Sequence, residues 1–130
     1  MLNDSGIPQA TEALVRNVLG CALAVHKELG PGFVERIYRE AMYLELEAQK
    51  LPFEAEKPIS VAYRGCAISG QRVDLIVGGE AVVELKAVVA IEPIHVAQVL
   101  SYLKTLSLRV GLLINFHEVL LKDGIRRVVR

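Results

Sequence analysis

Two short apolar segments that carry charged residues are the feature that most constrains how this chain folds. Residues 72–77 and 81–88 are rich in valine and isoleucine and are separated by a Gly-Gly turn, which predicts two adjacent central strands. The first contains Asp74, and the second contains Glu84 and Lys86. Because an unpaired charge is costly to bury, three ionisable groups in two such strands indicate a site.

The loop between these strands decides whether the two acids share a face. A two-residue loop would turn Asp74 and Glu84 to opposite faces of the sheet, because a shift of one residue reverses every side chain. A three-residue loop over residues 78–80 places Asp74 directly opposite Glu84, and Gly79 can supply the left-handed residue that such loops need. We predict the three-residue loop. Lys86 lies two residues after Glu84 and shares its face in either case.

This trio suits phosphodiester hydrolysis. Mg²⁺ prefers oxygen ligands and is usually held by one or two carboxylates, and Asp74 and Glu84 would form such a clamp. The ion would make its water more acidic and stabilise charge on the phosphate. Lys86 lies beside the clamp and could orient or help to activate the attacking water. The alternative is a structural ion-pair cluster, in which the two carboxylates simply neutralise the lysine.

Composition fixes the broad class of protein. The chain has 130 residues, of which 52% are hydrophobic and 23% charged, as expected for one globular domain over residues 1–130. No apolar run is long enough to cross a bilayer, and residues 1–5 do not resemble a secretion signal. Cys21 and Cys66 lack metal-ligand spacing. We therefore expect a cytoplasmic protein with reduced thiols and no membrane partner, in which Cys21 is a small core residue.

The net charge is zero, with 15 basic and 15 acidic residues. Strongly basic nucleic-acid binders are therefore disfavoured, although basic residues could still gather on one face. The candidates lie in the C-terminal third of the chain: Lys104, Arg109, Arg126, Arg127 and Arg130. A surface with scattered charges is the alternative.

Apolar periodicity predicts the order of elements. A helix is expected over residues 11–29 with Thr11 as N-cap, and a second over 34–50 with Ile37, Ala41, Leu44 and Ala48 on its buried face. Strands are expected over 59–63, 72–77 and 81–88, followed by a helix that Pro93 opens. A strand over 109–115 and a hairpin of 119–121 with 126–129 complete the chain.

The third helix has a polar face. His95, Gln98 and Tyr102 follow at spacings of three and four residues and therefore share one side. The apolar side of this helix is expected to consist of a different set: Ile94, Ala97, Leu100, Leu103 and Leu106. A polar helix face next to buried acids suggests that it belongs to the same site.

Four segments together resemble a known family. Residues 32–38, Gly-Phe-Val-Glu-Arg-Ile-Tyr, match the signature of the GxxExxY protein family, which is placed in the PD-(D/E)XK nuclease superfamily. Residues 72–77 and 83–86 resemble the metal-binding pair and lysine of that superfamily. Residues 98–102 resemble the Gln-x-x-x-Tyr element of its RecB-like branch. The resemblance extends from about Val15 to Val119, although Val73 stands where the superfamily is named for a proline.

The resemblance implies an α/β fold with an αβββαβ core, in which a mixed central sheet is flanked by helices. It implies that Asp74 and Glu84 are metal ligands and that Glu35 is an accessory acid near the metal. It further implies that Lys86 is the catalytic lysine. Gln98 and Tyr102 would shape the site or contact the phosphate.

The leading hypothesis is a Mg²⁺- or Mn²⁺-dependent nuclease, with DNA favoured over RNA as the substrate. The alternatives are a nucleic-acid-binding module that keeps the fold without cutting, and an interaction protein. A homodimer is compatible with each, because the high mean hydropathy of +0.37 suggests exposed apolar surface. A phosphate-binding Gly-rich loop, a zinc spacing and a serine-hydrolase elbow are absent from the sequence.

Overall fold

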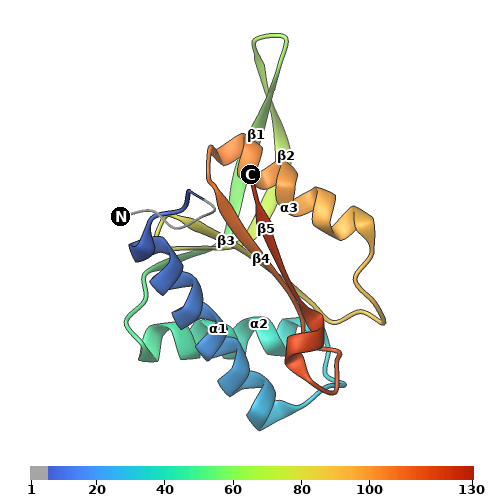
Figure 1. The fold of residues 1–130 in the computed structure, drawn as a ribbon. Coiled ribbons are helices and arrows are strands. Elements are labelled where there is room, and N and C mark those ends of the chain that lie inside the picture. Colours follow the sequence, from blue (N-terminus) through green and yellow to red (C-terminus); the bar gives the residue numbers. More distant parts are fainter. Residues whose placement is uncertain (1–5) are drawn as a thin grey trace.

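The computed structural model describes residues 6–130, which form a five-stranded sheet with three α-helices packed against it (Figure 1). Residues 1–5, on which the expectation about a secretion signal rests, lie outside the described part. The elements in chain order are α1 (Gln9–Leu29), α2 (Glu35–Ala48), β1 (Phe53–Tyr63), β2 (Cys66–Val77), β3 (Ala81–Lys86), α3 (Pro93–Leu106), β4 (Val110–Asn115), the short 3₁₀ helix η1 (Leu121–Gly124) and β5 (Ile125–Val129).

The strands follow one another across the sheet in the order β1-β2-β3-β4-β5. Only β3 and β4 are parallel, whereas the other neighbours are antiparallel. A parallel pair needs a long crossover connection, and α3 provides it. The expected α/β fold, with a mixed central sheet flanked by helices, is confirmed.

The helices cover opposite faces of the sheet. The side chains of β3 alternate, so that Val83 and Leu85 pack in the core beneath α1 and α2, while Val82 packs in a second core beneath α3. Glu84 and Lys86 have the same parity as Val82. Gly111 of β4 lets α3 approach closely, because a Cβ atom there would lie 2.6 Å from Val99 Cγ1.

The predicted register between β2 and β3 is confirmed. Val77 pairs with Ala81 across a three-residue loop, and the ladder continues to the pair of Leu75 and Val83. Gly78 and Gly79 both have positive φ, 62° and 70°, which residues with a Cβ atom rarely adopt. The loop therefore directs Asp74 and Glu84 toward each other.

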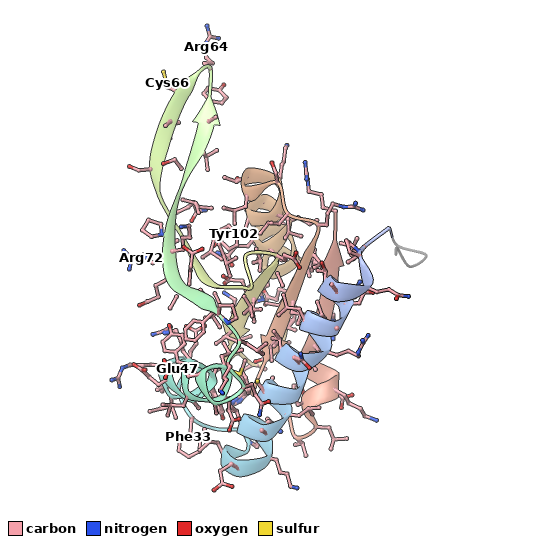
Figure 2. The ribbon with its side chains drawn as sticks, turned by 90° about the vertical axis from the view of Figure 1, so that its left-hand side faces the viewer. Phe33, Glu47, Arg64, Cys66, Arg72 and Tyr102 are labelled. Atoms are coloured by element: carbon pink, nitrogen blue, oxygen red, sulfur yellow. The ribbon has the colours of Figure 1, made fainter. Side chains whose placement is uncertain are left out.

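The hairpin of β1 and β2 is much longer than expected. The turn lies at Arg64 and Gly65, and a shift of register near Gly70 marks a bulge within paired strands where the sequence suggested a turn region. Residues 59–71, called the arm below, project beyond the rest of the molecule (Figure 1). Figure 2 shows Arg64 and Cys66 at the far end of the arm, well beyond Tyr102 of α3.

The buried faces of two helices differ from the predicted ones. In α2 the buried residues are Tyr38, Met42 and Leu46, whereas Leu44 is 68% exposed. In α3 the side that includes Tyr102 packs inward, and Ile94 is 67% exposed. Both helices carry apolar residues on more than one side. The apolar pattern alone therefore does not determine which side is buried, and packing against the rest of the molecule does.

Two predictions near the ends of the chain are wrong. Residues 119–121 do not form a strand of a hairpin, because β5 pairs with β4 and the preceding segment forms η1. Thr11 is not the N-cap of α1, which begins at Gln9. The Thr11 hydroxyl lies inside the first turns and donates to Glu80 Oε2 at 2.8 Å, which ties α1 to the loop between β2 and β3.

Candidate active site

The two acids of the site meet where β2 and β3 separate. The backbone ladder ends at Leu75 and Val83, and side-chain hydrogen bonds take its place beyond that pair. The N–H of Asp74 donates to Glu84 Oε1 at 3.0 Å, and the N–H of Leu85 donates to Asp74 Oδ2 at 3.0 Å. Each carboxylate therefore caps the backbone of the opposite strand with one oxygen. The second oxygens, Asp74 Oδ1 and Glu84 Oε2, make no hydrogen bond within residues 6–130.

Glu84 is buried and Asp74 is half-buried, so their surroundings disfavour the charged form of each carboxyl group. Glu84 is only 3% exposed. Desolvation and, next, the neighbouring charge of Asp74 raise the pKa of Glu84 to about 7. Desolvation also raises the pKa of Asp74, although the hydrogen bond from Leu85 and the charge of Lys86 act in the opposite direction. A site that concentrates two acids in this way favours the binding of a cation.

Lys86 lies near the two acids without forming a close ion pair with either. Its Nζ donates to Gln98 Oε1 of α3 at 3.4 Å. No ion pair within 4.0 Å joins Lys86 to Asp74 or Glu84 in the described part of the chain. This arrangement disagrees with a structural cluster in which the two carboxylates neutralise the lysine through ion pairs.

Tyr102 and Gln98 come from the helix that crosses over the site. Tyr102 is buried, and desolvation together with the charges of Glu84 and Asp74 raises its pKa to about 12. Its hydroxyl therefore stays protonated at neutral pH and can donate a hydrogen bond. His95, expected on the same polar face, has a local role instead: the N–H of Glu92 donates to its Nδ1 at 3.0 Å, in a capping box at the start of α3.

Glu35 enters from the first turn of α2. Desolvation and then the charge of Asp74 raise its pKa, while Lys86 and Arg39 lower it. Arg39 lies one turn further along α2 and forms an ion pair with Glu35 at 3.5 Å. Arg39 also lowers the pKa of Asp74, so it is a neighbour of the site that the sequence analysis missed. Its position four residues after Glu35 could have indicated it.

The spacing of Gly32, Glu35 and Tyr38 in this chain has a physical explanation in the structure. The Tyr38 hydroxyl donates to Gly30 O at 2.6 Å and accepts from the N–H of Phe33 at 3.1 Å. Its ring stacks on Phe116 with centroids 4.6 Å apart. Tyr38 thereby fixes the loop before α2, and this loop sets the position of Glu35.

Asn115 is a second residue that the sequence analysis missed. It is fully buried at the end of β4, opposite Lys86 in the parallel ladder. Its Oδ1 accepts from the N–H of Val88 at 3.0 Å and its Nδ2 donates to Val88 O at 2.9 Å. Asn115 thus holds the segment that follows Lys86. No local pattern signals this role, because it depends on pairing between distant strands.

The basic residues of the C-terminal third do not gather on one face. Arg127 of β5 forms an ion pair with Glu12 of α1 at 2.7 Å, whereas Lys104 lies on α3 across the sheet. Arg126 contacts backbone oxygens of Asp123 and Ile125.

The donor set fits a hard divalent cation held by two carboxylates. Asp74 and Glu84 each present one oxygen that no described hydrogen bond uses, and such an ion usually keeps several waters beside one or two carboxylates. Within residues 6–130, no group of three or more His, Cys, Asp or Glu side chains is placed to hold a metal ion. Direct ligation by Glu35 therefore stays a prediction.

Comparison with known protein families decides the assignment. The family model of the PD-(D/E)XK nuclease superfamily matches residues 12–128. The chain belongs to this superfamily. The comparison with curated proteins found no match.

Membership of the PD-(D/E)XK nuclease superfamily indicates a nuclease, whose substrate is nucleic acid, and members of this superfamily generally use divalent metal ions. The resemblance to the PD-(D/E)XK nuclease superfamily is confirmed, whereas the GxxExxY family and the RecB-like branch stay predictions. No helix in the described part of the chain is long and apolar enough to cross a membrane.

Proposed function

We propose that this protein is a Mg²⁺- or Mn²⁺-dependent nuclease that hydrolyses phosphodiester bonds, with DNA favoured over RNA. In this proposal Asp74 and Glu84 hold the metal, Glu35 assists them, and Lys86 acts on the attacking water. The observation that carries it is the pair of facing carboxylates, with Glu84 buried and Asp74 half-buried, each with an uncommitted oxygen. Such a pair is unfavourable alone and becomes favourable once a cation shares it.

The chain's own residues have distinct tasks in this mechanism. Gln98 accepts a hydrogen bond from Lys86 Nζ and so orients the ammonium group, which can then hold a water or a phosphate oxygen by its remaining protons. Tyr102, whose pKa is about 12, donates a hydrogen bond from its hydroxyl group to a phosphate oxygen and stays protonated. Bound at Asp74 and Glu84, a divalent cation would supply charge neutralisation at the phosphate and a more acidic water.

The remaining parts of the proposal concern the whole protein. We propose one domain over residues 1–130, since strands between Phe53 and Val129 share one sheet. A cytoplasmic location and a homodimer stay predictions. Sedimentation at micromolar concentration tests the dimer, and a clean monomer would contradict it.

A cleavage assay tests the function. Linear, circular, single-stranded and branched DNA, and RNA, are incubated with Mn²⁺ or Mg²⁺ and the wild-type protein, beside Lys86→Ala purified identically. We expect cutting by the wild type and a loss of about 100-fold or more in the variant, because a positioned general acid–base group contributes roughly that much. Equal cutting by both proteins would reveal a contaminant, and no cutting of any substrate would contradict the proposal.

A further inference from the structure

A trough runs along α3 between the arm and the candidate active site. One cavity of about 520 Å³ lies between residues 59–62 of the arm and the C-terminal half of α3. A second, of about 500 Å³, lies along the N-terminal half of α3 and reaches Lys86 and Gln98. Gln71 and Ser101 line both cavities, so the two adjoin. Together they are called the trough.

The charge of the trough suits a polyanion. Among the described residues that line it, none is acidic, and Lys86 and Lys104 lie toward opposite ends. The sequence explains this polarity, because residues 57–73 and 93–117 contain no Asp or Glu although the chain has 15 acidic residues. By contrast, the 14-residue helix α2 on the other face contains four Glu residues. The segments that line the trough therefore lack acidic residues, whereas α2 on the other face carries both acidic and basic ones.

The shape and chemistry of the trough favour an unpaired strand over a duplex. Its arm side presents Ile59 and Val61, and Tyr63 follows on the same face of β1 with 67% exposure. An apolar and aromatic surface stabilises exposed base faces, whereas the bases of a duplex are already stacked. The opposite wall offers the ammonium group of Lys104, which suits phosphate oxygens. The hydroxyl groups of Ser101 and Thr105 beside it donate to the backbone oxygens of Gln98 and Ser101.

We propose that the trough binds one unpaired strand of nucleic acid, with bases against Val61 and Tyr63 of the arm and phosphates toward Lys104 of α3, and directs it to Lys86. This inference rests on the proposed function for the identity of the site at the end of the trough. It adds that the substrate is single-stranded where it enters the site. It also gives the arm a role in binding.

Binding is measured by fluorescence anisotropy in a metal chelator, which prevents cutting. The probes are labelled oligo-dT and oligo-rU of about 15 nucleotides, at the upper end of single-strand site sizes, and a duplex of the same length. We expect the wild type to bind one or both single strands more tightly than the duplex. The two single-strand probes distinguish DNA from RNA as the source of the strand.

Three exposed positions supply the variants. Lys104→Ala is expected to weaken single-strand binding and to reduce the slope of log affinity against log salt by about 0.7, the value of one phosphate contact. Tyr63→Ala should weaken binding by about fivefold or more through lost stacking. Lys104→Glu should weaken it further than Lys104→Ala. The matched control is Lys122→Glu in η1, on an exposed residue away from the trough, and it should bind like the wild type.

The outcomes separate this inference from the proposed nuclease. Single-strand binding that depends on Lys104 and Tyr63, without cleavage in Mn²⁺, supports the trough and contradicts the nuclease. Cleavage of single strands that is unchanged in Lys104→Glu and Tyr63→Ala overturns the trough and leaves the nuclease intact. Tighter binding of the duplex also overturns the inference. So does a dimer in sedimentation that Tyr63→Ala dissociates without changing affinity for the strand, because the arm would then bind a second copy.

Discussion

Asp74 and Glu84 show how two residues create a site at the expense of local stability. Their proximity follows from the three-residue loop at residues 78–80, so it could be predicted from the sequence by counting residues and noting Gly79. Their burial and hydrogen bonds to the opposite backbone could not be predicted, because these depend on the point at which β2 and β3 separate. The role of Asn115 could not be predicted either, because it depends on pairing between β3 and β4, whereas the spacing of Arg39 from Glu35 could have indicated Arg39.

The pKa of Glu84 predicts a pH dependence of stability. The folded-state pKa is about 7, above the ordinary value of 4.5, so the folded protein binds more protons between these values than the unfolded chain. The contribution of Glu84 to stability is therefore fully present below pH 4.5 and is lost as the pH rises to about 7. Urea denaturation in a chelator should show the free energy of unfolding falling over this window. Glu84→Gln should flatten the fall, whereas Glu47→Gln, at an exposed position of α2, should not.

Asn115→Ala should affect the site through Val88. Loss of the side chain leaves the half-buried N–H and carbonyl of Val88 without their partner, which should reduce the free energy of unfolding by about 1–3 kcal/mol. Lys86 lies two residues earlier, so we expect kcat for cleavage to fall about tenfold or more through misplacement. Affinity for nucleic acid in a chelator should stay unchanged. Asn17→Ala, at an exposed position of α1, is the control, and an equal effect of both variants would contradict this role of Asn115.

At the scale of elements, the order of the helices and strands and most of the strand pairing could be predicted from the sequence, whereas the buried sides of the helices could not. The alternation of β1 and the glycine loop after β2 specify strands and register, because both are local signals. The inward face of α3 could not be read from its sequence, because apolar side chains surround most of the helix. The length of the arm could not be predicted, because Gly65 and Gly70 resemble the two ends of a turn region. In the structure the turn lies at Gly65, and Gly70 marks only a bulge between paired strands. The pairing of β5 with β4 could not be predicted, because it depends on the order of the strands in the sheet.

The close contact between α3 and β4 can be tested by adding one methyl group. Gly111→Ala would place a Cβ atom 2.6 Å from Val99 Cγ1, so α3 must shift away from the sheet. We expect a loss of about 1–3 kcal/mol in the free energy of unfolding. Gly20→Ala in α1 meets no atom within 4 Å and should be neutral or stabilise the helix by up to about 1 kcal/mol. Chemical denaturation of both variants checks this, and equal stability would contradict the contact.

At the scale of the whole molecule, the sheet separates a structural face from a working face. Helices α1 and α2 cover the first, with α2 rich in glutamate, while α3 and the arm line the second with neutral and basic side chains. The carboxylates of Asp74 and Glu84 lie at the edge between these regions. Such a pair belongs either to a cation site or to a structural cluster. In the absence of metal, removing one charge should stabilise the protein in the first case and destabilise it in the second.

Thermal unfolding of the wild type and Glu84→Gln, with and without Mn²⁺, tests the central claim that Asp74 and Glu84 form a cation site. The glutamine can keep the hydrogen bond from the N–H of Asp74 and removes only the charge. Without metal at pH 8, the variant should have a higher Tm than the wild type, because a buried charge has been removed. Mn²⁺ should raise the Tm of the wild type and leave that of the variant unchanged. A variant that is less stable without metal, or that Mn²⁺ stabilises as much as the wild type, would show that Asp74 and Glu84 do not form a cation site.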